Sequence, residues 1–300
     1  MTRKIRHATL SLTLLIWMGA CGTTRTAATN DHTTHADVAP IAGSLLISDA
    51  SLPAGAQDAL TRLNSSPRHG EWAMIRLGNG DSLKAWIVYP ERKTKAPVVV
   101  VIHEIFGLST WVRAVADQFA ADGFIAIAPD LLTMKNLPSG PDSVVAQAAT
   151  AAIRTLDPVT VQQQIDAAAK YAMALPAAQQ RYGVVGFCWG GGTSFQHAVH
   201  SPTLAAAVVY YGVSPPSASL TSVHAPVLGL YAGNDARVNA TIPAADSTMK
   251  ALGKVYSPNI YEGAGHGFLR QQTGQNGANT SAVRQAWPAT IAWFRKYLET

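Results

Sequence analysis

The stretch that most constrains the fold of this chain is a glycine-rich turn that ends an apolar run near residue 188. It reads Gly186-Phe187-Cys188-Trp189-Gly190, which has the form Gly-x-Cys-x-Gly. Flanking glycines allow a tight, strained turn from a strand into a helix without side-chain clash. Such a turn lifts Cys188 above the end of a sheet and points it at a helix N-terminus, whose positive end favours a thiolate. Taken alone, the pattern also fits a buried cysteine in a glycine-rich turn.

Strand and helix patterns alternate from about residue 68 to the C-terminus. The continuous β-branched run at 98–102 is typical of a strand buried on both faces, and 182–187 is expected to be the strand that leads into the turn at Cys188. A hairpin is expected at 72–89, around a turn at 78–81. Further expected elements are helices at 110–122, 141–175 with a break at 157–158, 191–200, 243–253 and 282–297, and strands at 124–128, 205–210, 227–231 and 255–261. This alternation predicts an α/β fold, with one mostly parallel central sheet and helices on both faces.

The first 21 residues resemble a targeting signal. Arg3, Lys4 and Arg6 precede an apolar core at 10–18, which is too short to span a bilayer. Met-Gly-Ala-Cys-Gly follows and resembles a bacterial lipobox, in which Cys21 is lipidated after cleavage. We therefore expect a signal peptide at 1–21, a flexible tether at 22–66 and a folded domain at 67–300. The alternative is an ordinary secretory signal and a periplasmic protein.

Composition and cysteine count narrow the classes of function. Of the 300 residues, 48% are apolar and 14% charged, which suits a globular protein with a large core. The net charge is +5, but three positive charges lie in the first six residues, so we expect no nucleic-acid partner. The chain has two cysteines, and lipidation of Cys21 leaves Cys188 without a disulfide partner in an exported protein. Such a thiol is either catalytic or an inert buried side chain.

A nucleophile in such a turn needs an acid and a histidine that follow it in that order along the chain. Asp235 follows the expected strand 227–231, and His266 follows 255–261. Both loops lie at the carboxyl ends of strands, where sites in open α/β sheets are built. His266 would take the Cys188 proton or hold it as an ion pair, and Asp235 would fix the imidazole tautomer. Each could singly be a turn or loop residue, but chance does not explain all three in this order.

A second block, His-Glu-Ile-Phe-Gly at 103–107, follows the most hydrophobic expected strand. In enzymes of this build, the oxyanion hole takes one backbone N–H from this loop and one from the residue after the nucleophile, here Ile105 and Trp189. A carboxylate at Glu104 beside a thiolate must be neutral, paired with a cation or turned away. We expect His103 to be a packed histidine. No motif for a metal, nucleotide or flavin occurs, so we expect no cofactor.

Four motifs together resemble those of the dienelactone hydrolases: His-Glu-Ile-Phe-Gly, Gly-Phe-Cys-Trp-Gly-Gly, Gly-Asn-Asp and Gly-Ala-Gly-His-Gly-Phe. The resemblance implies an α/β-hydrolase fold, a Cys188–His266–Asp235 triad and hydrolysis of an enol lactone. It also implies that Glu104 contacts the resting thiol and helps to form the thiolate when substrate displaces it. Arg270, four residues after the histidine, would bind a substrate carboxylate.

Some features depart from the family pattern and bear on the substrate. Gly267 stands where the family often has serine, and Trp189 is bulkier than the usual residue after the nucleophile. Arg154 is the nearest candidate for a second carboxylate-binding arginine, and we add Phe106 to the substrate-binding residues. We expect a monomeric hydrolase, lipid-anchored in the cell envelope, that acts on a small lactone or activated ester through an acyl-thioester. The alternatives are a broad-specificity envelope carboxylesterase and a non-catalytic lipoprotein that kept the fold.

Overall fold

A computed structural model describes residues 49–299 of the chain. These residues form an eight-stranded sheet in the order β1-β2-β4-β3-β5-β6-β7-β8. β1 (Gly70–Arg76) and β2 (Ser82–Val88) form an antiparallel hairpin, and β2 pairs antiparallel with β4 (Ile125–Pro129). The remaining neighbours pair in parallel. The expected hairpin and the expected mostly parallel α/β sheet are therefore confirmed.

The other elements follow the expected alternation of strands and helices. The side chain of Ser109 accepts the Val112 N–H at the start of α2 (Thr110–Ala121). Asp157 caps α4 (Pro158–Met173) by accepting the Thr160 N–H. In the described residues the further strands are β3 (Ala96–Ile102), β5 (Ala178–Phe187), β6 (Ala206–Tyr210), β7 (Val227–Asn234) and β8 (Tyr256–Gly265), and the helices are α1 (Ala59–Asn64), α2 (Thr110–Ala121), α3 (Asp142–Ile153), α4 (Pro158–Met173), α5 (Trp189–His200), α6 (Ala236–Asn239), α7 (Ile242–Ala251) and α8 (Ala278–Leu298).

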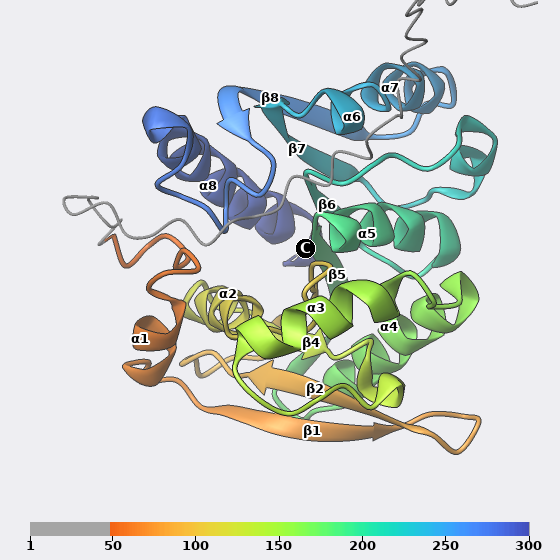
Figure 1. The fold of residues 1–300 in the computed structure, drawn as a ribbon. Coiled ribbons are helices and arrows are strands. Elements are labelled where there is room, and N and C mark those ends of the chain that lie inside the picture. Colours follow the sequence, from red (N-terminus) through yellow and green to blue (C-terminus); the bar gives the residue numbers. More distant parts are fainter. Residues whose placement is uncertain (1–48, 300) are drawn as a thin grey trace, which may run out of the picture. The chain divides into compact units, whose positions relative to one another are not determined.

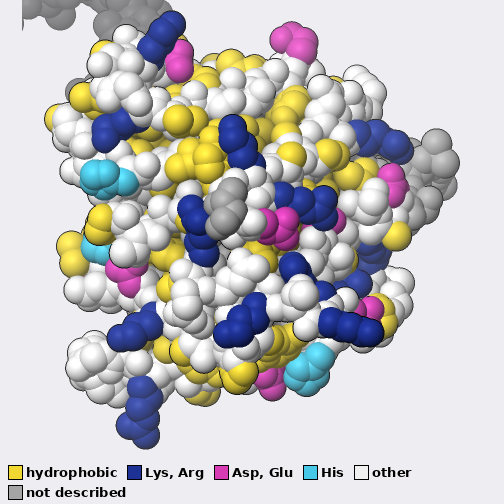
Figure 2. Space-filling model, turned by 180° about the vertical axis from the view of Figure 1, so that it is seen from behind, with side chains coloured by type: hydrophobic (Ala, Val, Ile, Leu, Met, Phe, Trp, Pro, Cys, Tyr) yellow, Lys and Arg dark blue, Asp and Glu magenta, His cyan; other side chains and the backbone are white. Residues whose placement is uncertain are grey.

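Helices cover both faces of the sheet (Figure 1). α1, α2 and α8 pack on one face around Phe119 and Trp287, and α4, α5 and α7 pack on the other around Ile165, Phe195 and Met249. All seven residues of β3 are buried, as its β-branched run predicts. The carboxyl ends of the parallel strands thus meet at one edge between two helical layers. On the face seen in Figure 2, Lys and Arg side chains are interspersed with acidic and apolar ones.

Packed structure begins earlier than the boundary at residue 67 that we expected. Leu52, Ala54 and Ala59 are buried in the same cluster as residues of α2 and α8, and α1 follows directly. The expectation of a tether is therefore wrong for residues 49–66, where a few apolar side chains are buried without any periodic pattern. The expected signal peptide and Cys21 lie outside the described residues. In the part of the chain that the structure describes, no helix has the length and apolar character needed to cross a membrane.

Candidate active site

Cys188 lies at the sharp turn between β5 and α5. Its backbone has φ 56° and ψ −115°, a conformation that is costly for any residue with a Cβ atom. Gly186 and Gly190 make the turn possible. A Cβ on Gly186 would lie 1.9 Å from the carbonyl oxygen of Gly190, and a Cβ on Gly190 would lie 2.3 Å from that of His103. The strained turn expected from the Gly-x-Cys-x-Gly pattern is thus present, with the half-buried sulfur at the start of a helix.

His266 and Asp235 lie beside Cys188 at this edge of the sheet. The Nδ1–H of His266 donates to Asp235 Oδ2 at 2.5 Å, and a hydrogen bond joins the imidazole to Cys188. Burial by itself lowers the pKa of His266, but the bonds with Asp235 and Cys188 outweigh it and raise that pKa to about 10. Asp235 is 8% exposed and also accepts the Val238 N–H. The site therefore favours an imidazolium next to the sulfur, where it stabilises negative charge.

Glu104 and Arg270 form an ion pair without a close hydrogen bond, beside the triad. Arg270 Nε lies 3.4 Å from Glu104 Oε2, and neither atom makes a hydrogen bond to another described residue. Burial raises the pKa of Glu104 to about 7, although Arg270 and His266 both oppose the rise. The carboxyl is thus paired with a cation and is easily protonated near neutrality. The guanidinium of Arg270 lies over the Phe106 ring, 4.9 Å from its centre.

Ile105 and Trp189 occupy positions suited to oxyanion donors. Ile105 lies in the turn after β3, and Trp189 is the first residue of α5, where N–H groups have no partner within the helix. The tight contact between Gly190 and His103 brings these two segments together. His103 is buried, as expected, and its Nε2 accepts the Leu131 N–H at 3.3 Å. The bulky Trp189 ring stacks on this histidine at 5.7 Å.

Tyr211 belongs to the site and was not expected from the sequence. It is fully buried, has φ 39°, and its ring meets that of His266 edge to face at 5.1 Å. Its hydroxyl makes no hydrogen bond to another described residue. Burial, followed by the charges of Glu104 and Cys188, raises the pKa of Tyr211 well above its ordinary value. The only sequence signal was its place at the end of an expected strand on the same edge.

Arg154 is exposed at the C-cap of α3, whereas Arg270 is half-buried against Phe106. Its assignment to carboxylate binding stays a prediction.

A hollow of about 360 Å³ adjoins the site. Phe106 and the residues that follow it form one wall, and Trp72, Lys84 and Arg113 form another. The Lys84 ammonium lies 4.0 Å from the centre of the Trp72 ring. Asp142 also lines the hollow and balances part of this positive charge. The hollow is therefore amphipathic, with aromatic surface and charges of both signs.

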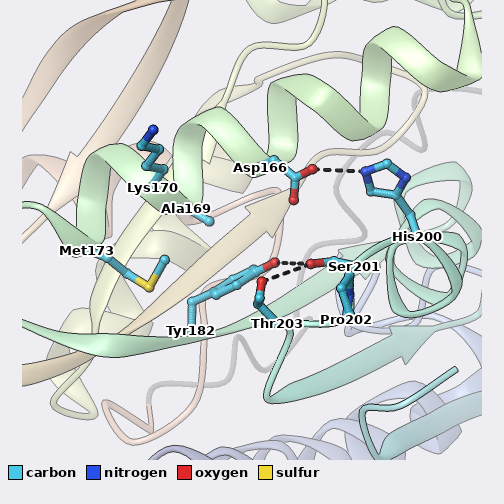
Figure 3. Close-up of a pocket in the computed structure, with 9 residues that line it drawn as sticks. All are labelled: Asp166, Ala169, Lys170, Met173, Tyr182, His200, Ser201, Pro202 and Thr203. Carbon is cyan, nitrogen blue, oxygen red and sulfur yellow. Dashed lines mark hydrogen bonds and ion pairs between the residues drawn. The ribbon is translucent and has the colours of Figure 1, made fainter.

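A separate pocket of about 360 Å³ lies between α4, β5 and the end of α5 (Figure 3). Polar groups that line it bond to one another: Tyr182 Oη to Ser201 Oγ at 2.9 Å, and His200 Nε2 to Asp166 Oδ2 at 2.9 Å. Tyr182 Oη also bonds at 3.1 Å to Nε2 of His197, which is fully buried and does not line the pocket. Burial lowers the pKa of His197 to about 3, so this network contains a neutral imidazole. None of the candidate catalytic residues lines this pocket. Within residues 49–299, no group of three or more His, Cys, Asp or Glu could hold a metal ion.

The dienelactone hydrolase family model matches residues 83–298. The chain belongs to the dienelactone hydrolase family. A “Putative carboxymethylenebutenolidase” of Salmonella typhi is 29% identical to it over 230 residues, which are 73% of this chain and 84% of that protein. A “Probable 2-oxo-3-(5-oxofuran-2-ylidene)propanoate lactonase” of a Bradyrhizobium species is 30% identical over 233 residues, 73% of this chain and 92% of that protein.

A solved structure titled as a “Putative Dienelactone Hydrolase” from Klebsiella pneumoniae matches with a TM-score of 0.68 at 25% identity. The match covers 77% of this chain and 99% of that one. The family resemblance and the α/β-hydrolase fold that we expected are thereby confirmed.

Proposed function

We propose that this protein is a carboxylic ester hydrolase that opens an enol lactone or an activated ester through Cys188, His266 and Asp235. The observation that carries the proposal is the hydrogen-bonded series from Asp235 through His266 to a cysteine at a strained strand-to-helix turn. Membership of the dienelactone hydrolase family supports it. So do the names of the Salmonella and Bradyrhizobium relatives, which describe a butenolidase and a lactonase.

In the proposed reaction, the Cys188 thiolate attacks the lactone carbonyl carbon while the N–H groups of Ile105 and Trp189 stabilise the oxyanion. The ring C–O bond then breaks, and the departing oxygen takes the proton held by His266. The product is an acyl-thioester. Water attacks this thioester, gives one proton to His266 and releases the acid, and the thiolate is restored. Because a thiolate is itself readily expelled from the tetrahedral intermediate, an enolate leaving group suits this nucleophile better than an alkoxide or an amide nitrogen.

The substrate that fits this site best carries a carboxylate near the lactone ring. The half-buried Arg270 is held only loosely by Glu104, at 3.4 Å, and a guanidinium recognises a carboxylate through paired hydrogen bonds. A substrate anion that pairs with Arg270 would leave Glu104 with less cationic support and so nearer its protonated form. The adjoining hollow beside Phe106 provides room for further parts of the substrate.

The test is a substrate panel that compares an anionic dienelactone, a neutral lactone and p-nitrophenyl acetate. Arg270→Ala should lower kcat/KM for the anionic lactone about tenfold or more, because it removes a hydrogen bond between charged groups. It should change kcat/KM for p-nitrophenyl acetate by less than about threefold. The exposed Arg237→Ala is the matched control and should change neither. Equal rates of wild type and Arg270→Ala on the anionic lactone would refute carboxylate recognition by this residue.

The same panel separates the alternatives. A broad-specificity carboxylesterase would prefer neutral esters over the anionic lactone. A non-catalytic lipoprotein would hydrolyse none of the three, and its Cys188 would react slowly with iodoacetamide at neutral pH. Fast alkylation that Asp235→Asn slows would count against a non-catalytic role.

We also propose that the protein is a monomer held in the cell envelope by a lipid on Cys21, facing the periplasm or the surface. The Met-Gly-Ala-Cys-Gly sequence supports this localisation. Metabolic labelling with a palmitate analogue should mark the wild type, and Cys21→Ser should abolish the label. An unlabelled wild type would point to an ordinary secretory signal instead, and a labelled Cys21→Ser protein would show that the lipid is on another residue.

A further inference from the structure

A segment that precedes the family-matched residues lies across the loop that carries Arg270. We define this strap as residues 49–58; it comes before α1, and the family model begins at residue 83. The Ala56 N–H donates to the Arg270 carbonyl at 2.9 Å. Two residues further on, Gln272 Nε2 donates to the Pro53 carbonyl, also at 2.9 Å. The carbonyl of Arg270 and the side chain of Gln272, which both follow the Arg270 Cα along the chain, are therefore tied to the strap.

The strap is also tied to α2 and, through it, to the residue before the candidate nucleophile. The indole N–H of Trp111 donates to the Ala54 carbonyl at 3.0 Å. Trp111 is 2% exposed, and its ring meets Phe187 edge to face at 5.1 Å. Phe187 directly precedes Cys188. One buried side chain thus links the strap to the strained turn.

Arg62 of α1 fixes the outer end of the strap. Its guanidinium donates to the carbonyls of Leu52 at 3.0 Å and Asp49 at 3.4 Å, and to Gln118 Oε1 of α2 at 3.0 Å. Leu52 and Ala54 are 4% and 3% exposed. These contacts order a strap that has no regular secondary structure of its own over most of its length.

We propose that the strap is a positioning element that holds Arg270 for recognition of a carboxylate-bearing substrate. The inference rests on the proposed function. A long arginine side chain is placed only as well as its backbone, and recognition of a carboxylate tolerates displacements of only about 0.5 Å. Residues 266–272 form a loop between β8 and α8, and two of the bonds that anchor its far end, from Ala56 and to Pro53, come from the strap. Loosening the strap should therefore weaken the binding of anionic substrates more than that of neutral ones.

The test uses the full chain with two substitutions that cut the strap contacts but keep apolar packing. Trp111→Phe removes the donor to Ala54. Gln272→Leu removes the donor to Pro53 and also the bond of the same amide to the Leu269 carbonyl at 3.1 Å within the loop, so Trp111→Phe is also measured alone. The control is Trp287→Phe, because Trp287 is 1% exposed in the same core and its indole donates instead to Asp122 at 3.0 Å. The double variant should raise KM for the anionic lactone about tenfold, with kcat and the rate on p-nitrophenyl acetate changed less than about twofold. The control should leave the ratio of kcat/KM for the anionic lactone to kcat/KM for p-nitrophenyl acetate unchanged.

Hydrogen exchange gives a readout that does not depend on hydrolysis. The amides of Arg270 and Gln271 donate to the Gly267 carbonyl at 2.9 Å. In the double variant they should exchange about tenfold faster or more, whereas Trp287→Phe should leave them unchanged. An equal loss of kcat/KM on both substrates, or unchanged amide exchange across residues 267–272, would overturn the strap's role. If the wild type hydrolysed nothing, the proposed function would fail, and unchanged or faster exchange would still decide whether the strap orders this loop.

Discussion

Replacing Glu104 with glutamine should stabilise the protein in alkaline solution and leave its stability in acid unchanged. A glutamate carboxyl ordinarily has a pKa of 4.5, and burial raises the pKa of Glu104 to about 7 in the folded protein. A raised carboxyl pKa means that the folded state keeps its full stability below pH 4.5 and loses some as pH rises through about 7. The gap of about 2.5 pKa units corresponds to a loss of about 3 kcal/mol at about 1.4 kcal/mol per unit.

Glutamine has nearly the same shape and does not ionise, so Glu104→Gln should be more stable than wild type by about 1 to 3 kcal/mol at pH 8.5. The pKa of about 7 already includes the attraction of Arg270, so the lower figure allows only for an imperfect match between the amide and the protonated carboxyl. The assay is urea unfolding followed by circular dichroism at several pH values from 4 to 8.5. The exposed Glu262→Gln is the control and should show no such pH-dependent gain. A difference in unfolding free energy between Glu104→Gln and wild type that stays constant with pH would contradict a raised pKa at Glu104.

Other substitutions test the turn, the acid and the buried tyrosine. Gly186→Ala would place a methyl group 1.9 Å from the Gly190 carbonyl oxygen, so it should lower the free energy of unfolding by more than about 3 kcal/mol; a melting temperature like that of the wild type would contradict this. Asp235→Asn should keep the circular dichroism spectrum and lower kcat about 10³- to 10⁴-fold, because an amide does not stabilise imidazolium at His266; a loss below tenfold would remove Asp235 from the mechanism. Tyr211→Phe deletes a buried hydroxyl that makes no hydrogen bond within residues 49–299, and it should raise the free energy of unfolding by about 1 kcal/mol; destabilisation in urea would show that the hydroxyl has a stabilising partner.

Much of the fold was predictable because local patterns agree with it. Continuous β-branched runs mark strands buried on both faces, and Ser109 and Asp157 mark helix starts by the hydrogen bonds that their side chains accept. The carboxyl ends of parallel strands meet at one edge, so Asp235 and His266 could be assigned to the same site as Cys188 from their order alone. The structure brings them together, with His266 Nδ1 at 2.5 Å from Asp235.

The features that sequence reasoning missed depend on contacts between distant parts of the chain. Ala54 and Trp111 are 57 positions apart, and Pro53 and Gln272 are 219 apart, so no local pattern indicates the strap. Tyr211 stands in an ordinary strand end, and its φ of 39° becomes visible only in the packed structure. Burial, which raises the pKa of Glu104 to about 7, likewise depends on tertiary packing rather than on sequence neighbours.

We propose Cys188 as the nucleophile of a lactone or ester hydrolase. The most direct measurement compares hydrolysis of an anionic enol lactone by purified wild type and Cys188→Ala, with mass spectrometry of the wild type during turnover. We expect hydrolysis by the wild type, a mass increase equal to the acyl group on the peptide that contains Cys188, and a loss of kcat of at least about 10³-fold in the variant. Near-wild-type turnover by Cys188→Ala, or an acyl group on another residue, would contradict it.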